Sequence, residues 1–299
     1  MPLHPSLLDH LRAANTPPAV ETVRSLGDIA AGAVADFNNT DAGRERRRAA
    51  SSLESITDRE IRAAFETSFE LSGKLADYID LPTPTPEDLA EAGVDYAYLA
   101  GEYERMEAEG LEPRIVLAPH GLGLDNWRAI FSKATADSTI PNNPLKDPGD
   151  GAGLYVWDEA AANWHTFDKA PSHTTAPGQA ELAHVTTTTH GGVGDTATWT
   201  IRIVPGTQTP HHLKKSYAQT VTEGIQHQTV PEMLTDKLTA IMVGQPPTDT
   251  THWAWCDNGK LGAGSAPGGR WRVGCGRVRV ALADVDYSDD FLGSRSPVG

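Results

Sequence analysis

The strongest constraint on the fold is an alternation of residue types near the end of the chain. Residues 277–283 read Arg-Val-Arg-Val-Ala-Leu-Ala. Successive side chains of a β-strand point to opposite faces, so the two valines and the leucine share one face, and the arginines and alanines share the other. Trp271 repeats the pattern, because Arg270 and Arg272 flank it on the opposite parity. We predict a β framework that buries Trp271 on one face and leaves the other face open to solvent or a ligand.

The sequence before residue 110 favours helices. A capping box at residues 57–60, Thr-Asp-Arg-Glu, predicts a helix with Thr57 as its N-cap. Thr85 followed by Pro86 predicts the start of another helix, because proline suits the first helical position. A third apolar stripe with helical spacing is predicted to end at Gly110.

After residue 110 most patterns indicate strands. Strands are predicted over residues 114–118, 153–157 and 199–203, and helices over residues 124–134 and from residue 231 to Gly244. Residues 170–196, rich in Thr, Gly and His, are predicted to form a long loop. The predicted fold class is α+β, with a helical region over residues 1–110 and a second domain over residues 111–299 that contains a small antiparallel sheet.

Charge and composition exclude several classes of protein. The chain has 25 Lys and Arg against 40 Asp and Glu, a formal net charge of −15. This argues against nucleic acid as a partner, because phosphate binding depends on Lys and Arg. No apolar run approaches the roughly 20 residues that span a bilayer. No signal peptide is visible at the N-terminus, so we expect a cytoplasmic, phage-associated or non-standardly exported protein.

The closing segment carries a resemblance to a known family. A Gly-Gly-x-Trp stretch at residues 268–271 is followed by a strand, an Asp-rich loop and Leu-Gly-Ser-Arg at residues 292–295. Upstream, Thr-Val-Pro-Glu at residues 229–232 opens a helix and Trp-Ala-Trp follows at residues 253–255. This order resembles the C-type-lectin-like fold of the formylglycine-generating-enzyme type. It is closest to the variable proteins of diversity-generating retroelements, among them phage major tropism determinants.

The resemblance implies a ligand-binding role for residues 111–299, with a variable-type segment over about residues 253–299. In those relatives the Gly-Gly-x-Trp turn leads into a strand and a Gly-x-Arg strand closes the chain. The residues with an implied structural role are Gly268, Gly269, Trp271, Gly293 and Arg295. The residues predicted to contact the ligand are Arg270, Arg272, Val273, Gly274, Cys275, Ala281, Ala283, Asp284, Tyr287, Asp289 and Phe291.

The expected ligand is a macromolecule, a protein rather than a small substrate, since Arg and Tyr dominate binding hot spots. The resemblance also implies diversification by mutation at adenines, often in Asn codons, which cannot produce Trp, Lys, Glu, Gln or Met. From residue 268 to residue 299 the chain contains none of these five types except Trp271. The segment is therefore compatible with a diversified one.

Other functions stay open at this point. A formylglycine-generating-type oxidase uses a cysteine pair in the closing segment, whereas here only Cys275 lies there and Cys256 precedes the Gly-rich loop. A structural, tail-fibre-like component is the third possibility. The sequence predicts no catalytic residue, no resident metal and no cofactor. An incidental Ca²⁺ ion in the Asp-rich loop at residues 284–290 is an open alternative, and the oligomeric state is open too.

Overall fold

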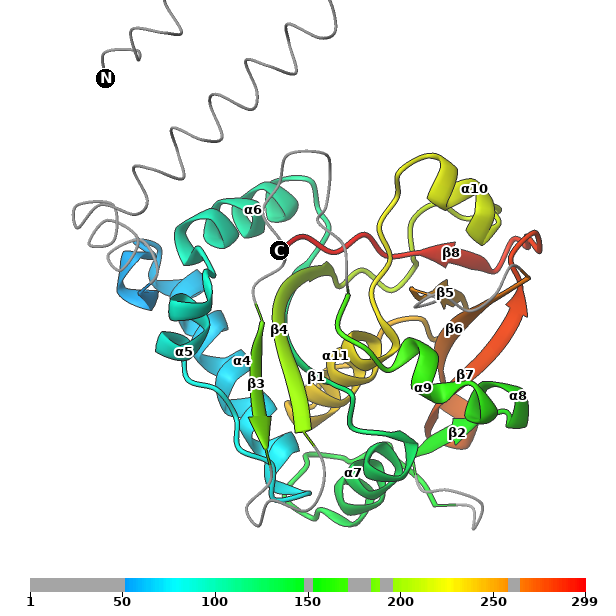
Figure 1. Cartoon of the computed structure of the whole chain (residues 1–299), viewed down its shortest axis with the longest axis horizontal. Helices are drawn as coiled ribbons and strands as arrows, with labels where there is room; N and C mark the ends of the chain where they lie inside the picture. Colours follow the sequence, from blue (N-terminus) through cyan, green and yellow to red (C-terminus); the bar gives the residue numbers. More distant parts are fainter. Residues whose placement is uncertain (1–51, 148–152, 172–183, 189–195, 258–263) are drawn as a thin grey trace, which may run out of the picture. The chain divides into compact units, whose positions relative to one another are not determined.

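The computed structural model describes residues 52–147, 153–171, 184–188, 196–257 and 264–299 (Figure 1). All of them belong to one compact unit that spans residues 51–299. It combines helices with two small sheets, so the fold is of the α+β class. No helix among these residues is both long enough and apolar enough to cross a membrane.

The first part of the unit is helical, as predicted. It contains the 3-10 helix η1 (Leu53–Ser55) and the helices α4 (Arg59–Asp77), α5 (Pro86–Ala92) and α6 (Tyr96–Ala108). Thr85 caps α5 through a capping box, and Gly110, at φ 74°, follows α6. The prediction of Thr57 as the cap of α4 was wrong. Asp58 is the N-cap instead, and its carboxylate accepts the N–H groups of Glu60 and Ile61 at the first turn.

A three-stranded antiparallel sheet follows, with strands in the order β1 (Pro113–His120), β4 (Thr196–Pro205) and β3 (Val185–Thr188). Helix α4 lies along the free edge of β1, where Ser68 and Ser72 donate hydrogen bonds to the carbonyl oxygens of Ile115 and Leu117. Covering an edge in this way prevents it from pairing with another chain. Strand β3 corrects the predicted loop over residues 170–196, because residues 185–188 pair with β4.

Strand β4 is buried on both faces, which its alternating sequence did not predict. Thr200 is buried and forms a hydrogen bond with His120. Arg202 is buried and forms an ion pair with Glu232 of helix α11 (Val230–Met242). Polar residues on the second face therefore indicate polar partners here, not solvent. Helix α11 is also buried almost all round, although its sequence predicted a single apolar stripe.

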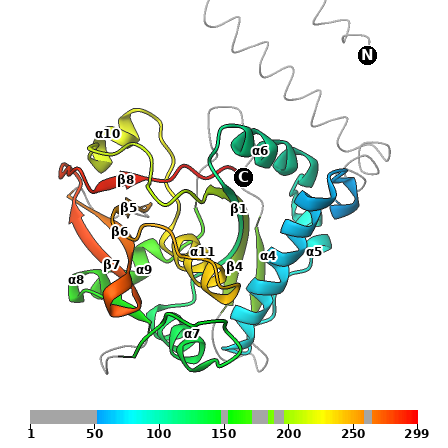
Figure 2. The same cartoon turned by 180° about the vertical axis from the view of Figure 1, so that it is seen from behind.

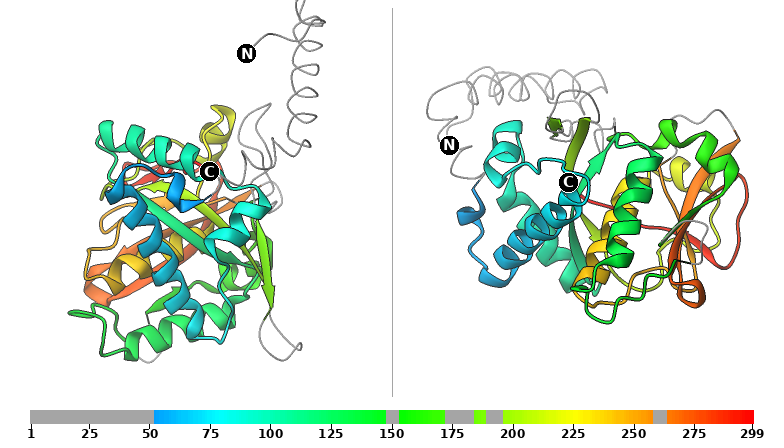
Figure 3. Two further views of the ribbon diagram at one scale, coloured as in Figure 1. Left: turned by 90° about the vertical axis from the view of Figure 1, so that its left-hand side faces the viewer. Right: turned by 90° about the horizontal axis from the view of Figure 1, so that it is seen from below.

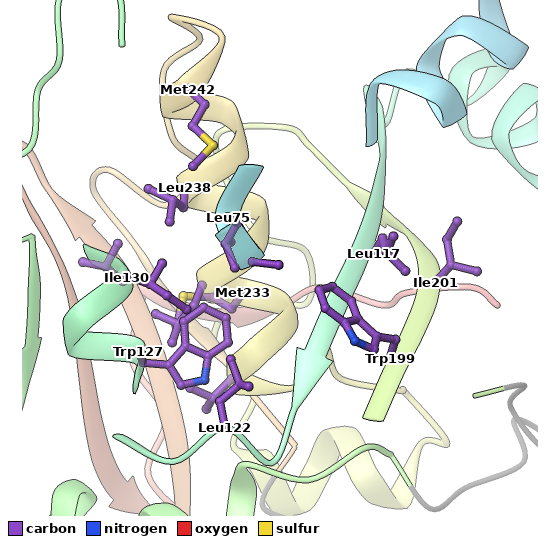
Figure 4. Packing of buried hydrophobic residues seen from close by; sticks show 14 of the residues in the cluster. Leu75, Leu117, Leu122, Trp127, Ile130, Trp199, Ile201, Met233, Leu238 and Met242 are labelled. Atoms are coloured by element: carbon purple, nitrogen blue, oxygen red, sulfur yellow. The ribbon is translucent and has the colours of Figure 1, made fainter. Parts of the chain in front are cut away.

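Helix α11 lies between the two sheets (Figures 2 and 3). Its residues Met233 and Leu238 share a core with Trp127 of helix α7 (Leu124–Ala136) and Leu75 of α4 (Figure 4). That core runs from Ile56 to Val280. The change of character near Gly110 is therefore a change of secondary structure within one hydrophobic core.

The second sheet has five strands in the order β2 (Leu154–Val156), β7 (Arg277–Asp284), β6 (Ser265–Arg272), β5 (Trp253–Trp255) and β8 (Leu292–Ser294). The β1–β4–β3 sheet matches the predicted small antiparallel sheet, whereas this second sheet is mixed. Strands β5, β6 and β7 pair antiparallel, whereas β2 joins β7 and β8 joins β5 in parallel. The remaining elements are α8 (Asp158–Ala162), α9 (Trp164–Phe167), α10 (Tyr217–Thr222) and η2 (Val273–Cys275).

Candidate functional site

The inner face of the five-stranded sheet packs against helix α11. Trp271 is 3% exposed and Val278 and Val280 are fully buried, so the predicted parity of these strands is confirmed. Gly269 lies within β6 and not in a turn before it, which corrects the turn implied for Gly268 and Gly269. A Cβ atom at Gly269 would collide with the Cε atom of Met233 and lie 2.9 Å from its Sδ atom, so any larger residue there would force the Met233 side chain of α11 to move.

The outer face of the same strands carries a pocket of about 480 Å³. Its floor is made of three small residues, Gly268, Ala281 and Ala283, which lie on one face of β6 and β7. Larger side chains surround this floor, and the pocket forms because the floor residues leave space between them. The pocket is lined by Thr251, Trp253, Trp255, Gly268, Arg270, Ala281, Ala283, Tyr287, Asp289, Phe291 and Leu292.

Six of the residues predicted to contact a ligand line this pocket: Arg270, Ala281, Ala283, Tyr287, Asp289 and Phe291. The others lie elsewhere on the surface. Arg272, Val273, Gly274 and Cys275 form the opposite end of the β6–β7 hairpin, where η2 makes the turn. Asp284 is exposed at the end of β7. The structure thus brings together one part of the predicted set and separates it from the hairpin turn.

The site also contains aromatic residues that were not predicted to contact a ligand. Trp253 and Trp255 lie on the outer face of β5, and Leu292 joins them from β8. Tyr155 of β2 and the adjacent Trp157 extend the aromatic surface beside β7. The Trp-Ala-Trp and Tyr-Val-Trp triplets have the same period-two pattern as β7, and that pattern could have placed these rings on a common face.

Arginine side chains lie on these aromatic rings. The Cζ atom of Arg270 is 5.5 Å from the ring centroid of Trp253, and that of Arg279 is 5.7 Å from the rings of Trp157 and Tyr155. Such cation–π contacts hold a guanidinium group in place. Arg277 is only 8% exposed although it lies on the outer parity, because its guanidinium group packs over Tyr155.

The Asp-rich loop is held by hydrogen bonds of its own carboxylates. Asp284 Oδ1 accepts the N–H of Asp286, and Asp289 Oδ1 accepts the N–H of Phe291. The Tyr287 hydroxyl donates to Asp289 Oδ2 at 2.8 Å, and this bond raises the pKa of Tyr287 above its ordinary value. Over the described ranges, no group of three or more His, Cys, Asp or Glu side chains could hold a metal ion. These contacts position Tyr287 and Phe291 at the rim of the pocket.

The closing Gly-Ser-Arg segment is built into the interior. A Cβ atom at Gly293 would lie 3.0 Å from the Leu213 side chain, and Arg295 is fully buried. Arg295 forms an ion pair with Asp249 at 2.7 Å, and Lys237 of α11 reaches the same carboxylate at 2.6 Å. These two cations hold the pKa of Asp249 at about 2, despite its complete burial. Neither Asp249 nor Lys237 was predicted from the sequence.

The two cysteines are free, and they differ in environment. Cys256 is fully buried at the end of β5, and burial raises the pKa of its thiol far above the ordinary range. Cys275 is partly exposed in η2, where Arg279 lies 3.6 Å from its sulfur. A buried thiol that resists ionisation is a poor nucleophile or metal ligand.

Comparisons with protein-family models, with curated proteins and with solved structures found no match to this chain. The outer face of the five-stranded sheet is therefore assigned as the candidate site on its geometry alone.

Proposed function

We propose that this chain is a binding protein that recognises a macromolecular ligand, a protein, through the outer face of the five-stranded sheet. The observation that carries the proposal is the exposure of large apolar side chains around the pocket. Tyr287 is 50% exposed, Phe291 58% and Trp157 36%. Large apolar side chains gathered at one opening are typical of interaction sites, whereas scattered ones are not.

The site has the features of a binding hot spot. A pocket of this volume accepts a large side chain of a partner, and Trp, Tyr and Arg are the types that contribute most to interface affinity. The floor belongs to strands whose opposite face is packed on α11, and the rim loop is held by hydrogen bonds of Asp284 and Asp289, so the surface is well supported. A rigid face reduces the entropy lost on binding.

The resemblance to C-type-lectin-like variable proteins supports the same function, and we include it in the proposal. Its diversification component has an independent test in the neighbouring DNA. We expect a near-repeat of the end of the gene, mismatched only at adenines of the repeat, together with a reverse transcriptase gene. A neighbourhood that lacks both would remove diversification from the proposal and leave binding to be judged on its own.

The oxidase alternative is disfavoured by the cysteines. It requires two thiolates that act together, whereas the Cys256 thiol is buried in the core and its pKa is raised. Copper titration followed by thiol-dependent oxygen consumption distinguishes the two functions. We expect no copper-dependent oxygen uptake by the native chain, and therefore no difference between it and Cys275→Ser.

The binding function is tested by site-specific photo-crosslinking. A photoreactive phenylalanine at position 287 is expected to capture a partner in the producing cells, whereas the same group at the exposed control position Tyr98 on α6 does not. The captured protein is then purified and titrated against the full chain. Phe291→Ala is expected to weaken binding roughly 10-fold or more. Equal capture at both positions, or unchanged affinity, would overturn the proposal.

A further inference from the structure

The outer face places arginines directly opposite one another on adjacent strands. Arg270 of β6 is the register partner of Arg279 of β7, and Arg272 is the partner of Arg277. Side chains directly opposite in an antiparallel pair lie close together, and like charges in that arrangement are destabilising. The fold therefore maintains an arrangement of charges that works against its own stability.

Three of these arginines have no acidic partner in the described part of the chain. No carboxylate of the described residues lies within ion-pair distance of Arg270, Arg272 or Arg279. Arg202 and Arg295, the interior arginines, pair with Glu232 and Asp249. The pKa of Arg270 is lowered by burial and by its neighbours Arg272 and Arg279. None of these three guanidinium groups is therefore tied up in an ion pair within the described residues, although Asp289 lines the same pocket.

The aromatic rings fix the direction of the guanidinium groups. Trp157 and Trp253 lie 5.8 Å apart, with Arg279 over the first ring and Arg270 over the second. Within the described structure, the buried Nε atoms of Arg270 and Arg279 have no hydrogen-bond partner. Ring stacking leaves the edge of a guanidinium group, with its terminal N–H donors, available to the planar, two-oxygen geometry of a carboxylate.

We infer that the ligand of this face is an acidic protein segment, whose carboxylates pair with Arg270 and Arg279 while an adjacent apolar side chain enters the pocket. This inference rests on the proposed function and names the chemistry of its ligand. A segment of this kind satisfies both halves of the site, because Trp255, Phe291 and Leu292 line the pocket beside the arginines. An anionic polysaccharide would supply the charge without the apolar side chain.

The test uses the full chain and three probes. The first is a synthetic peptide that alternates Glu with Leu and Tyr, the second is the same peptide with Gln in place of Glu, and the third is an oligogalacturonate. Affinity is measured by calorimetry. We expect the Glu peptide to bind and the Gln peptide and the oligogalacturonate to bind roughly 10-fold more weakly or not at all, since charged hydrogen bonds contribute about that much each.

Single variants test whether the arginines contribute to binding without being needed for folding. R270Q and R279Q remove the charge but keep a polar side chain with an NH2 donor, and each is expected to weaken binding of the Glu peptide roughly 10-fold or more. R128Q is the matched control, because Arg128 is an exposed arginine on α7 outside the site, and its affinity is expected to equal that of the native chain. Circular dichroism melts establish that all three variants fold.

The outcomes distinguish this inference from the function on which it rests. Equal binding of the Glu and Gln peptides, no loss in R270Q and R279Q, no binding of the Glu peptide, or tighter binding of oligogalacturonate would each overturn the acidic-segment ligand. The partner captured at position 287, and its dependence on Phe291, would still stand in each case. Loss of that partner would overturn the proposed function instead.

Discussion

The two faces of strands β6 and β7 share one backbone but meet different demands. On the inner face, neighbouring atoms determine each residue: Gly269 faces Met233, and Trp271 is buried in the core. On the outer face, a Cβ atom at Gly268 would meet nothing closer than 3.4 Å, and alanines border the pocket. Packing therefore explains the inner residues and leaves the outer ones unexplained. Residues that packing does not determine are the ones on which a function can act.

The largest loss of folding stability is expected from removing a buried charge beneath the sheet. Asp249→Ala leaves Lys237 and Arg295 buried without their shared carboxylate, and removing one partner of a buried ion pair costs about 5 kcal/mol. Asp289→Ala on the outer face is the control, with an expected change within about 0.5 kcal/mol. Urea denaturation measures both. Comparable losses in the two variants would abolish the distinction between the faces.

Trp271→Ala is expected to lower the free energy of unfolding by about 4 kcal/mol, because it opens a cavity against the core. Arg272→Ala removes an exposed side chain of β6 and Tyr287→Ala one of the loop after β7, so the melting temperatures of both variants are expected to stay close to that of the native chain. Thermal unfolding followed by circular dichroism checks all three. The opposite ranking would mean that the two faces are assigned the wrong way round.

Acid is expected to weaken the support beneath the outer face. His227 stacks on Tyr217, which packs against Trp255, and burial lowers the pKa of His227 to about 4. The unfolded chain, with its ordinary His pKa of 6.5, binds the proton first as pH falls. His227 thus contributes stability that is complete above pH 6.5 and decreases towards pH 4, by about 3 kcal/mol.

The measurement compares urea unfolding of the native chain and His227→Gln at pH 7 and pH 4.5. The variant is expected to lose less stability over this range. Burial lowers the pKa of His120 to about 4 as well and raises that of Asp168 to about 6, and these two groups act with opposite signs in both proteins. The difference between the two proteins therefore isolates His227, and parallel pH profiles would contradict the prediction.

The smallest effect sharpens the comparison most, because it uses adjacent residues. Gly269→Ala forces the Met233 side chain to move and is expected to cost about 1 kcal/mol, since methionine adapts to such changes. Gly268→Ala projects into the pocket and is expected to change stability by less than about 0.5 kcal/mol. The Gly268→Ala variant is expected to change the affinity for the ligand instead, because Gly268 lines the pocket. Equal stability changes in the two variants would show that α11 does not determine the inner face.

Local patterns predicted the elements that depend on neighbours in the sequence. Pro86 and Gly110 marked helix ends, and the alternation in β7 separated Val280 from Ala281. The parallel additions of β2 and β8 were beyond reach, because each strand is three residues long and its partner is distant in the chain. Strand order of this kind is decided by tertiary packing.

The candidate site was predictable only in part, for the same reason. Arg270, Ala281 and Tyr287 followed from parity and from the resemblance, but Trp157 reaches the site through β2, which joins the sheet from far upstream. Asp249 and Lys237 gave no local signal either. Lys237 lies on a helix whose charged side chains would ordinarily be assigned to solvent, and its burial depends on a carboxylate that only the folded chain supplies.

The pocket floor consists of one hydrogen atom and two methyl groups, from Gly268, Ala281 and Ala283. Replacing any of them by a longer side chain changes the depth and shape of the opening, while the atoms packed against α11 stay where they are. A lineage could thus exchange one binding preference for another by single codon changes, with little penalty to folding.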